Sequence, residues 1–216
     1  GARLVLAGRS EARHADVLRS IGPCCAAFVP LDLGSLDSVR DAASTVLSLG
    51  EPIHGLINNA GLAGSRGLTK DGFELTFGVN HLGPYLFTRL LVDTLVQNAP
   101  SRVVNVSSRA HLRARGIPFE ALRSPTASTT GMPEYCVSKL ANVLFTKSLV
   151  AKYGARGVAA FALHPGVVAT DIWRSLPGPV EWVIKRFMIT PEEGAATTLH
   201  CATARDLRSE EHTSEL

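Results

Sequence analysis

The chain has 216 residues, which is enough for one domain with a buried core. Hydrophobic residues make up 45% of it and charged residues 19%, the usual balance of a globular enzyme. The formal net charge is only +3 and the basic residues are scattered, so the composition gives no support for a nucleic-acid-binding protein.

The cysteines and the apolar runs bear on the cellular compartment. The four cysteines show neither the spacing of metal ligands nor that of a disulfide framework; they are Cys24, Cys25, Cys136 and Cys201. We therefore expect reduced thiols in a cytosol-facing protein. The sequence contains no stretch of about 18 uninterrupted apolar residues and no signal peptide. Whether a membrane anchor precedes residue 1 stays open.

Short β-branched or apolar runs alternate with helical patterns along the chain. The strand-like runs are residues 3–7, 26–31, 55–58, 102–107 and 158–164. The helical patterns are residues 11–21, 36–49, 83–97, 134–153 and 191–204. Strands separated by helices of this length predict βαβ units, and hence an α/β fold in which helices cover both faces of a parallel sheet. The long irregular stretch at 109–133 is typical of a functional or disordered loop.

Both ends of the sequence depart from this pattern. The chain starts at Gly1, inside a run that has the character of a buried strand. Residues 208–216, with the sequence RSEEHTSEL, are polar without a regular period and resemble a translated sequencing adapter. We therefore expect residues 1–207 to be part of a domain from a longer protein, followed by a non-native tail.

The helix predicted at 134–153 carries a polar pair on an otherwise apolar pattern. Its apolar stripe, which we expect to pack on the sheet, consists of Val137, Leu140, Ala141, Leu144, Phe145 and Leu149. Tyr135 and Lys139 are one turn apart near the start of the helix, so their side chains share a face. A single Tyr-x-x-x-Lys match has little weight, because such a pair can equally be a solvated surface pair.

Three further motifs lie at the ends of predicted strands: LINNAG at 56–61, VVNVSS at 103–108 and HPGVVATDIW at 164–173. Together with EYCVSK at 134–139 they resemble the short-chain dehydrogenase/reductase family. The resemblance covers nearly the whole chain up to residue 204. The particular residues in and after these motifs are most similar to those of the retinol dehydrogenase-like branch. It implies a Rossmann-like doubly wound parallel sheet.

The resemblance implies a catalytic set made of Asn80, Ser108, Tyr135 and Lys139. Tyr135 would be the acid/base, because a phenol with a pKa of about 10 becomes a useful base only beside positive charge. Lys139 would lower that pKa and hold the nicotinamide ribose, and Ser108, rather than Ser107, would hydrogen-bond the substrate oxygen. Asn80 would position a water that extends the proton relay to Lys139. Taken singly, each could instead be a structural polar residue.

The implied cofactor residues follow the strand ends, where open α/β sheets bind nucleotides. Arg9 stands where an acidic residue would hold a free ribose 2′-hydroxyl, and a guanidinium there suits a 2′-phosphate. NADP(H) is therefore expected rather than NAD(H). Asp32 and Leu33 would frame the adenine. The remaining implied contacts are Asn58, Ala60, Gly61, Tyr135, Lys139, Pro165, Gly166, Val168 and Thr170.

The family's glycine-rich turn, Thr-Gly-x-x-x-Gly-x-Gly, is absent from the chain. It would lie before Gly1, so no pyrophosphate-binding residue can be named, and we expect the fold to lack its first strand and helix. In the strand order 3-2-1-4-5-6 that strand is central. Residues 3–7 and 55–58 are therefore expected to face a gap with unpaired edges, and residues 1–216 alone to be inactive and aggregation-prone.

The expected reaction interconverts a carbonyl and an alcohol on an apolar substrate of the retinoid, steroid or long-chain aldehyde type. An apolar lid would fit such a substrate, although ordinary core packing explains the same spacing equally well; its residues are Val180, Val183, Ile184, Phe187 and Met188. A catalytically silent NADP-binding scaffold and a sugar-nucleotide epimerase or dehydratase are the alternative functions. Whether the protein forms a homodimer also stays open.

The histidines give no indication of a metal site. No ligand spacing is found for His14, His54, His81, His111 and His200. His164, which begins the HPG motif, is expected to be a buried histidine with satisfied hydrogen bonds rather than a catalyst.

Overall fold

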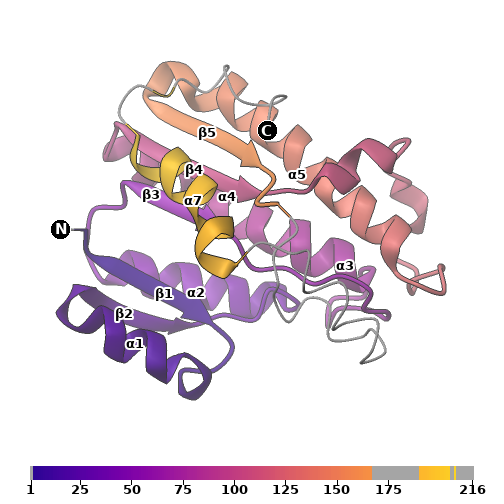
Figure 1. The fold of residues 1–216 in the computed structure, drawn as a ribbon, viewed down its shortest axis with the longest axis horizontal. Coiled ribbons are helices and arrows are strands. Elements are labelled where there is room, and N and C mark those ends of the chain that lie inside the picture. Colours follow the sequence, from indigo (N-terminus) through magenta and orange to yellow (C-terminus); the bar gives the residue numbers. More distant parts are fainter. Residues whose placement is uncertain (1, 167–189, 205–206, 208–216) are drawn as a thin grey trace.

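The computed structural model describes residues 2–166, 190–204 and 207, and the strands in this part form two parallel sheets (Figure 1). β1 (Leu4–Gly8) pairs with β2 (Cys25–Pro30) in one sheet. In the other, β3 (Gly55–Asn58), β4 (Ser101–Val106) and β5 (Val158–Leu163) follow in the order β3-β4-β5. The predicted strands and their parallel arrangement are confirmed.

The longer helices lie where the apolar periodicity predicts them, and short helical segments are additional. They are α1 (Ala15–Ile21) after the 3-10 turn η1 (Ala12–His14), α2 (Leu36–Ser48), α3 (Leu75–Phe77), α4 (Gly83–Gln97), α5 (Met132–Tyr153) and α7 (Pro191–Thr203). The sequence did not predict α3 or the π-helical turn Gly78–Leu82 that joins it to α4.

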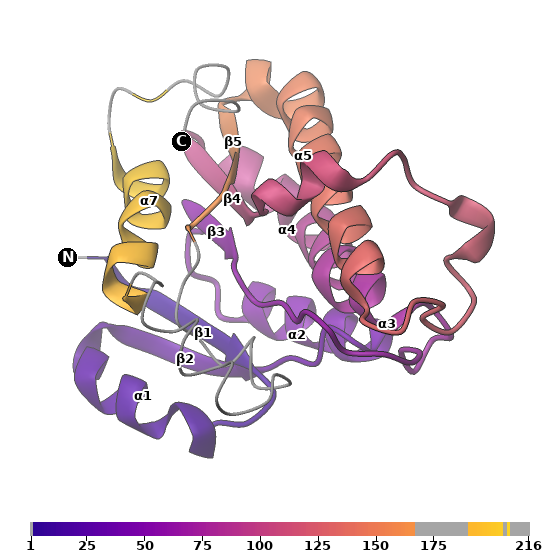
Figure 2. The same ribbon diagram turned by 45° about the vertical axis from the view of Figure 1, so that its right-hand side comes forward.

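Alternating strand residues face two helical layers. Val103 of β4 packs in a cluster with α4 and α5, whereas its neighbour Val104 packs in a cluster that includes α7. In β2, Val29 packs with α2 and α4, and the adjacent Phe28 contacts the η1 turn before α1. As a result α2, α4 and α5 form one layer, and α1 and α7 lie on the opposite side (Figure 2).

A break separates the two sheets, and helices bridge it. One apolar cluster joins Val29 of β2 to α2 and α4, with Leu56 of β3 packed against it. Within the described residues β1 pairs only with β2, and β3 only with β4. Apolar side chains of both strands remain exposed, Leu4 by 41% and Ile57 by 45%. The expected break, with an unpaired edge on each side, is therefore present.

We expect residues 1–216, expressed alone, to self-associate through the open edges of β1 and β3. An open edge presents backbone donors and acceptors to another chain. Each such group that stays buried and unpaired costs about 1–3 kcal/mol, against a total stability of about 5–15 kcal/mol.

Sedimentation velocity tests this expectation. Ile57→Lys puts a charge on the β3 edge and should reduce the large species, whereas the control Leu112→Lys, on an exposed residue outside the sheets, should not. A cooperatively melting monomer that binds NADP(H) would contradict the expectation.

The face of α5 that packs on the sheet is more polar than its sequence suggests. Phe145 and Leu149 are buried as predicted, but Leu144 is 47% exposed. Asn142 and Thr146 are buried instead, and their side chains form hydrogen bonds with the π-helical turn and with β4. The predicted stripe is wrong at Leu144, because apolar spacing alone does not reveal where buried polar side chains find partners.

The remaining predictions concern membrane-spanning helices, the cysteines, the C-terminal tail and the apolar lid. None of the helices in the described part combines the length and the apolar character needed to cross a membrane. All four cysteines are free thiols. The tail at 208–216 and the predicted lid lie outside the described residues; the lid residues are Val180, Val183, Ile184, Phe187 and Met188.

Candidate active site

The predicted site residues lie where parallel strands end. Arg9 directly follows β1, and Asp32 comes shortly after β2. Ala60, Ser108 and Pro165 come shortly after β3, β4 and β5. Parallel strands of one sheet end at the same edge, and open α/β sheets bind their ligands there. This edge is therefore the candidate site.

A glycine and a carboxylate fix the start of α5. Gly131, just before the first turn, has a φ of 67°, and a Cβ at this position would lie 3.0 Å from the Ser65 carbonyl oxygen. Glu134 in the first turn accepts hydrogen bonds from the backbone N–H and the hydroxyl of Ser128. These contacts tie the preceding loop to the helix and so position Tyr135.

Lys139 lies beside Tyr135 on α5, as predicted. Its Nζ is 5.5 Å from the centroid of the Tyr135 ring and donates a 2.8 Å hydrogen bond to the carbonyl oxygen of Val106, the last residue of β4. The residue is only 4% exposed, and burial lowers the pKa of its ammonium to about 8. The pair is therefore not the solvated surface pair that the sequence left open.

The phenol of Tyr135 differs from the expectation. Burial raises the pKa of Tyr135, and hydrogen bonding with the Ser108 side chain opposes that rise only in part. In the protein alone the net shift is upward, because loss of hydration outweighs the other effects on the phenolate, and the lowering of this pKa by Lys139 stays a prediction. The phenol consequently stays protonated at neutral pH, which suits a proton donor.

The two serines after β4 have different environments. Ser107 is 4% exposed; its Oγ donates to the Lys139 carbonyl oxygen at 2.8 Å, and its N–H donates to the Leu163 carbonyl oxygen at 2.7 Å. It therefore ties β4 to α5 and β5. Ser108 is half-buried; its Oγ accepts from the Ala110 N–H at 3.2 Å, and its side chain lies near enough to Tyr135 to lower the pKa of the phenol. The structure thus brings Ser108, the serine chosen from the sequence, to the phenol.

Asn80 lies in the π-helical turn Gly78–Leu82, a type of helix interruption that is frequent at functional sites. Its Oδ1 accepts from the Leu62 N–H at 2.8 Å, and its Nδ2 donates to the Leu62 carbonyl oxygen at 2.9 Å. A Cβ on Gly61 would lie 3.1 Å from Asn80 Oδ1 and 3.7 Å from Lys139 Nζ. Asn80 therefore holds the loop after β3 close to Lys139, and its relay through water stays a prediction.

The side chain of Asn58 joins a buried network. Its Nδ2 donates to Thr88 Oγ1 at 3.0 Å and to Asn105 Oδ1 at 2.8 Å. Asn105 is 2% exposed and donates in turn to Thr146 Oγ1 at 2.9 Å. The side-chain nitrogen of Asn58 therefore donates its hydrogen bonds inside the protein. The predicted contact with the ribose would have to use the side-chain oxygen or the backbone of Asn58. Sequence reasoning missed Asn105, although a polar residue inside the apolar run VVNVSS was a signal.

Asp32 and Leu33 form part of a tight turn after β2. Asp32 Oδ1 accepts from the Gly34 N–H at 3.0 Å, and Oδ2 lies 3.9 Å from Lys70 Nζ. Leu33 touches the start of α4, where a Cβ on Gly83 would lie only 2.6 Å from the Leu33 carbonyl oxygen. The turn is therefore fixed next to α4, and its contact with adenine stays a prediction.

The other implied cofactor positions follow β3 and β5. Ala60 and Gly61 are exposed. Pro165 and Gly166 follow β5, and Gly166 has a φ of 86°, which favours glycine. Two further predicted residues lie outside the described part of the chain, Val168 and Thr170.

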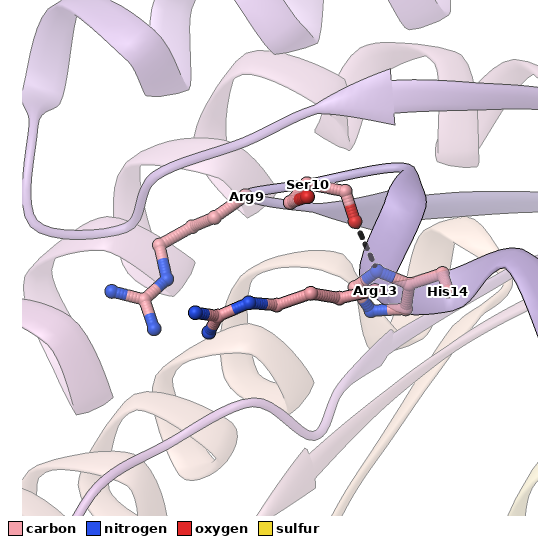
Figure 3. A pocket seen from close by; sticks show the side chains of 4 residues that line it. All are labelled: Arg9, Ser10, Arg13 and His14. Carbon is pink, nitrogen blue, oxygen red and sulfur yellow. Dashed lines mark hydrogen bonds between the residues drawn. The ribbon is translucent and has the colours of Figure 1, made fainter.

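A cavity of about 780 Å³ opens beyond the end of β1 (Figure 3). Among the described residues, its lining consists of Arg9, Ser10, Arg13 and His14. Arg9 was predicted from the sequence, but Arg13 and His14 were not, because they form part of a helical pattern without a motif. Figure 3 shows the two guanidinium groups on the same side of the turn. The described part of the lining is therefore cationic and suits a phosphate.

His164, directly after β5, does not match its prediction. Its buried Nδ1 has no hydrogen-bond partner within the described part of the chain. Burial lowers the pKa of the imidazole, and the nearby Arg109 and His111 lower it further. His164 is therefore a neutral histidine at pH 7 whose hydrogen bonds are not all satisfied among these residues, contrary to the expectation.

The layers of helices around parallel strands, with a buried tyrosine–lysine pair at the strand ends, define a Rossmann-like protein. The family model described as Enoyl-(Acyl carrier protein) reductase matches residues 1–204. A solved structure described as a short chain dehydrogenase/reductase family protein has a TM-score of 0.73 and 25% identity, over 97% of this chain and 83% of that one. The chain belongs to the short-chain dehydrogenase/reductase family.

Retinol dehydrogenases are among its relatives, as the motifs suggested. The chain is 46% identical to retinol dehydrogenase 12 of Homo sapiens over 180 residues, which are 82% of this chain and 56% of that protein. It is 40% identical to retinol dehydrogenase 11 of Homo sapiens over 214 residues, which are 96% of this chain and 67% of that protein. The chain thus spans between 56% and 67% of the length of these two relatives.

Proposed function

We propose that the protein is an NADP(H)-dependent oxidoreductase that interconverts a carbonyl and an alcohol on an apolar substrate. The observation that carries this proposal is the burial of Lys139 beside Tyr135. Within the described residues no carboxylate forms an ion pair with Lys139. Burying an ammonium without a carboxylate is costly, and such perturbed groups are concentrated at functional sites.

The residues can move a proton and orient a carbonyl. A bound nicotinamide cofactor supplies or accepts the hydride. In reduction, Ser108 would hydrogen-bond the carbonyl oxygen, and the Tyr135 hydroxyl would give its proton to that oxygen. Lys139 stabilises the phenolate that remains. In oxidation the phenolate takes the proton of the alcohol. The raised pKa of Tyr135 keeps the proton on the phenol for reduction.

Arg9 supports NADP(H) as the cofactor. It lies at the end of β1 in the cationic cavity, where a guanidinium can hold a 2′-phosphate through two hydrogen bonds. In the full-length protein, we expect Arg9→Asp to shift the preference from NADP(H) toward NAD(H) by about 1–3 kcal/mol, because the new carboxylate repels the phosphate. The measurement is the ratio of kcat/KM values for the two cofactors. An unchanged ratio would mean that Arg9 does not recognise the phosphate.

The substrate class follows from the relatives' names and from the apolar pattern at 180–188. Retinol dehydrogenases act on an apolar alcohol, and we propose a retinoid, steroid or long-chain aldehyde for this protein. With NADPH, the full-length protein should turn over medium-chain aldehydes and retinal faster than short polar ketones, because only the former gain from apolar burial. Faster turnover of the short polar ketones would contradict the apolar substrate.

A further inference from the structure

We propose that Arg13 is a second phosphate-binding guanidinium, which acts with Arg9 to select cofactors that carry a 2′-phosphate. This inference rests on the proposed NADP(H)-dependent function and names a specificity residue that no motif indicates. Arg13 lies in η1, four positions after Arg9, and lines the same cavity of about 780 Å³.

The two arginines line the same cavity, and their guanidinium groups point toward the same side in Figure 3. In Figure 3 the side chains of both arginines extend from the segment after β1 toward the same side of the view. Within the described residues neither of them forms an ion pair, whereas Arg19 pairs with Asp16 on α1. Two like charges in one cavity repel each other, so a dianion between them is favoured. A phosphate monoester has this charge and accepts from both guanidinium forks.

The turn that carries both arginines is held by His14. Because a carbonyl oxygen only accepts, Nδ1 of His14 donates the 2.7 Å hydrogen bond to the Ser10 carbonyl oxygen. The imidazole also contacts the Phe28 ring, with 5.4 Å between the ring centroids. A Cβ on Gly8 would lie 2.6 Å from His14 Cε1, so the ring fits only because residue 8 is glycine. These contacts of His14 hold the backbone turn on which Arg9 and Arg13 stand.

The cavity is assigned to the 2′-phosphate on the adenosine ribose of the cofactor. The cavity follows β1, next to the strand whose end carries Asp32, and dinucleotides bind along this edge of the sheet. A 5′-phosphate alone would not distinguish NADP(H) from NAD(H). A second arginine at the 2′-phosphate makes the distinction stronger, because each charge-assisted hydrogen-bonding group contributes separately.

The test is isothermal titration of the full-length protein with two probes, adenosine 2′,5′-bisphosphate and 5′-AMP. We expect Arg13→Gln to weaken binding of the bisphosphate by roughly 10- to 100-fold and to leave 5′-AMP binding unchanged. Arg9→Gln should do the same, and the double variant should lose the preference for the bisphosphate. Arg13→Lys should retain part of it, because the charge remains without the bidentate fork. Arg19→Gln, on the next helix, is the matched control and should behave as wild type.

Each of the other possible outcomes contradicts either the role of Arg13 or the NADP(H) assignment. If Arg13→Gln keeps the wild-type preference while Arg9→Gln loses it, Arg13 does not bind the phosphate and the NADP(H) assignment stands. If Arg13→Gln weakens both probes equally, Arg13 has a structural role and the inference is wrong. If the wild-type protein binds both probes equally well, the NADP(H) assignment fails, and the role of Arg13 fails with it.

Discussion

Replacing Tyr135 by Phe in the full-length protein is expected to lower kcat by about 10²–10⁴-fold. The substitution removes only the hydroxyl that donates the proton and keeps the ring, whose centroid lies 5.5 Å from Lys139 Nζ. Binding of NADPH should therefore stay close to that of the wild type. Steady-state kinetics and a fluorescence titration with NADPH measure the two quantities separately.

Tyr153→Phe is the matched control for this experiment. Tyr153 lies at the other end of α5, where its hydroxyl accepts a hydrogen bond from Arg89 on the protein surface. Its removal should leave kcat nearly unchanged. A Tyr135→Phe variant with nearly wild-type kcat would remove Tyr135 from the mechanism, whatever the cofactor affinity.

Lys139→Met should change how stability depends on pH. The pKa of Lys139 is about 8 in the folded protein and about 10.5 when unfolded, so between these values the unfolded state binds more protons and stability rises with pH. From about pH 7 to about pH 9.5 this group adds about 2 kcal/mol to the free energy of unfolding. The variant should lack that increment, as measured by denaturant unfolding of the full-length protein at the two pH values.

The control for this measurement is Lys147→Met, an exposed lysine on the same helix. It should keep the wild-type increase in stability with pH. The raised pKa of Tyr135 acts in the opposite direction, but only above its usual pKa of about 10, outside the range measured. An increase that is the same in Lys139→Met and in the wild type would show that Lys139 is not a buried cation.

The parts of the fold that depend on local spacing could be predicted from the sequence. The strands at 55–58 and 158–164 were found from short apolar runs. Tyr135 and Lys139 could be placed side by side because residues four apart share one face of a helix. Ser108 could be placed near them because it ends a strand whose carboxyl end lies at the sheet's binding edge.

Features that depend on partners far apart in the sequence could not be predicted. Asn58 and Asn105 are distant in the chain, and their hydrogen bond exists only because β3 and β4 are paired. Burial sets the pKa of Tyr135 above its usual value, and the depth of burial follows from the packing of the whole domain. Arg13 was missed because only the η1 turn brings it to the cavity of Arg9.

The most direct test of the account is turnover by the wild-type full-length protein with NADPH and an apolar aldehyde, measured beside NADPH binding. The account predicts that the protein binds NADPH and consumes it with formation of the alcohol. A protein that binds NADPH but converts no aldehyde, ketone or alcohol in an apolar panel would contradict the account and indicate a catalytically silent scaffold.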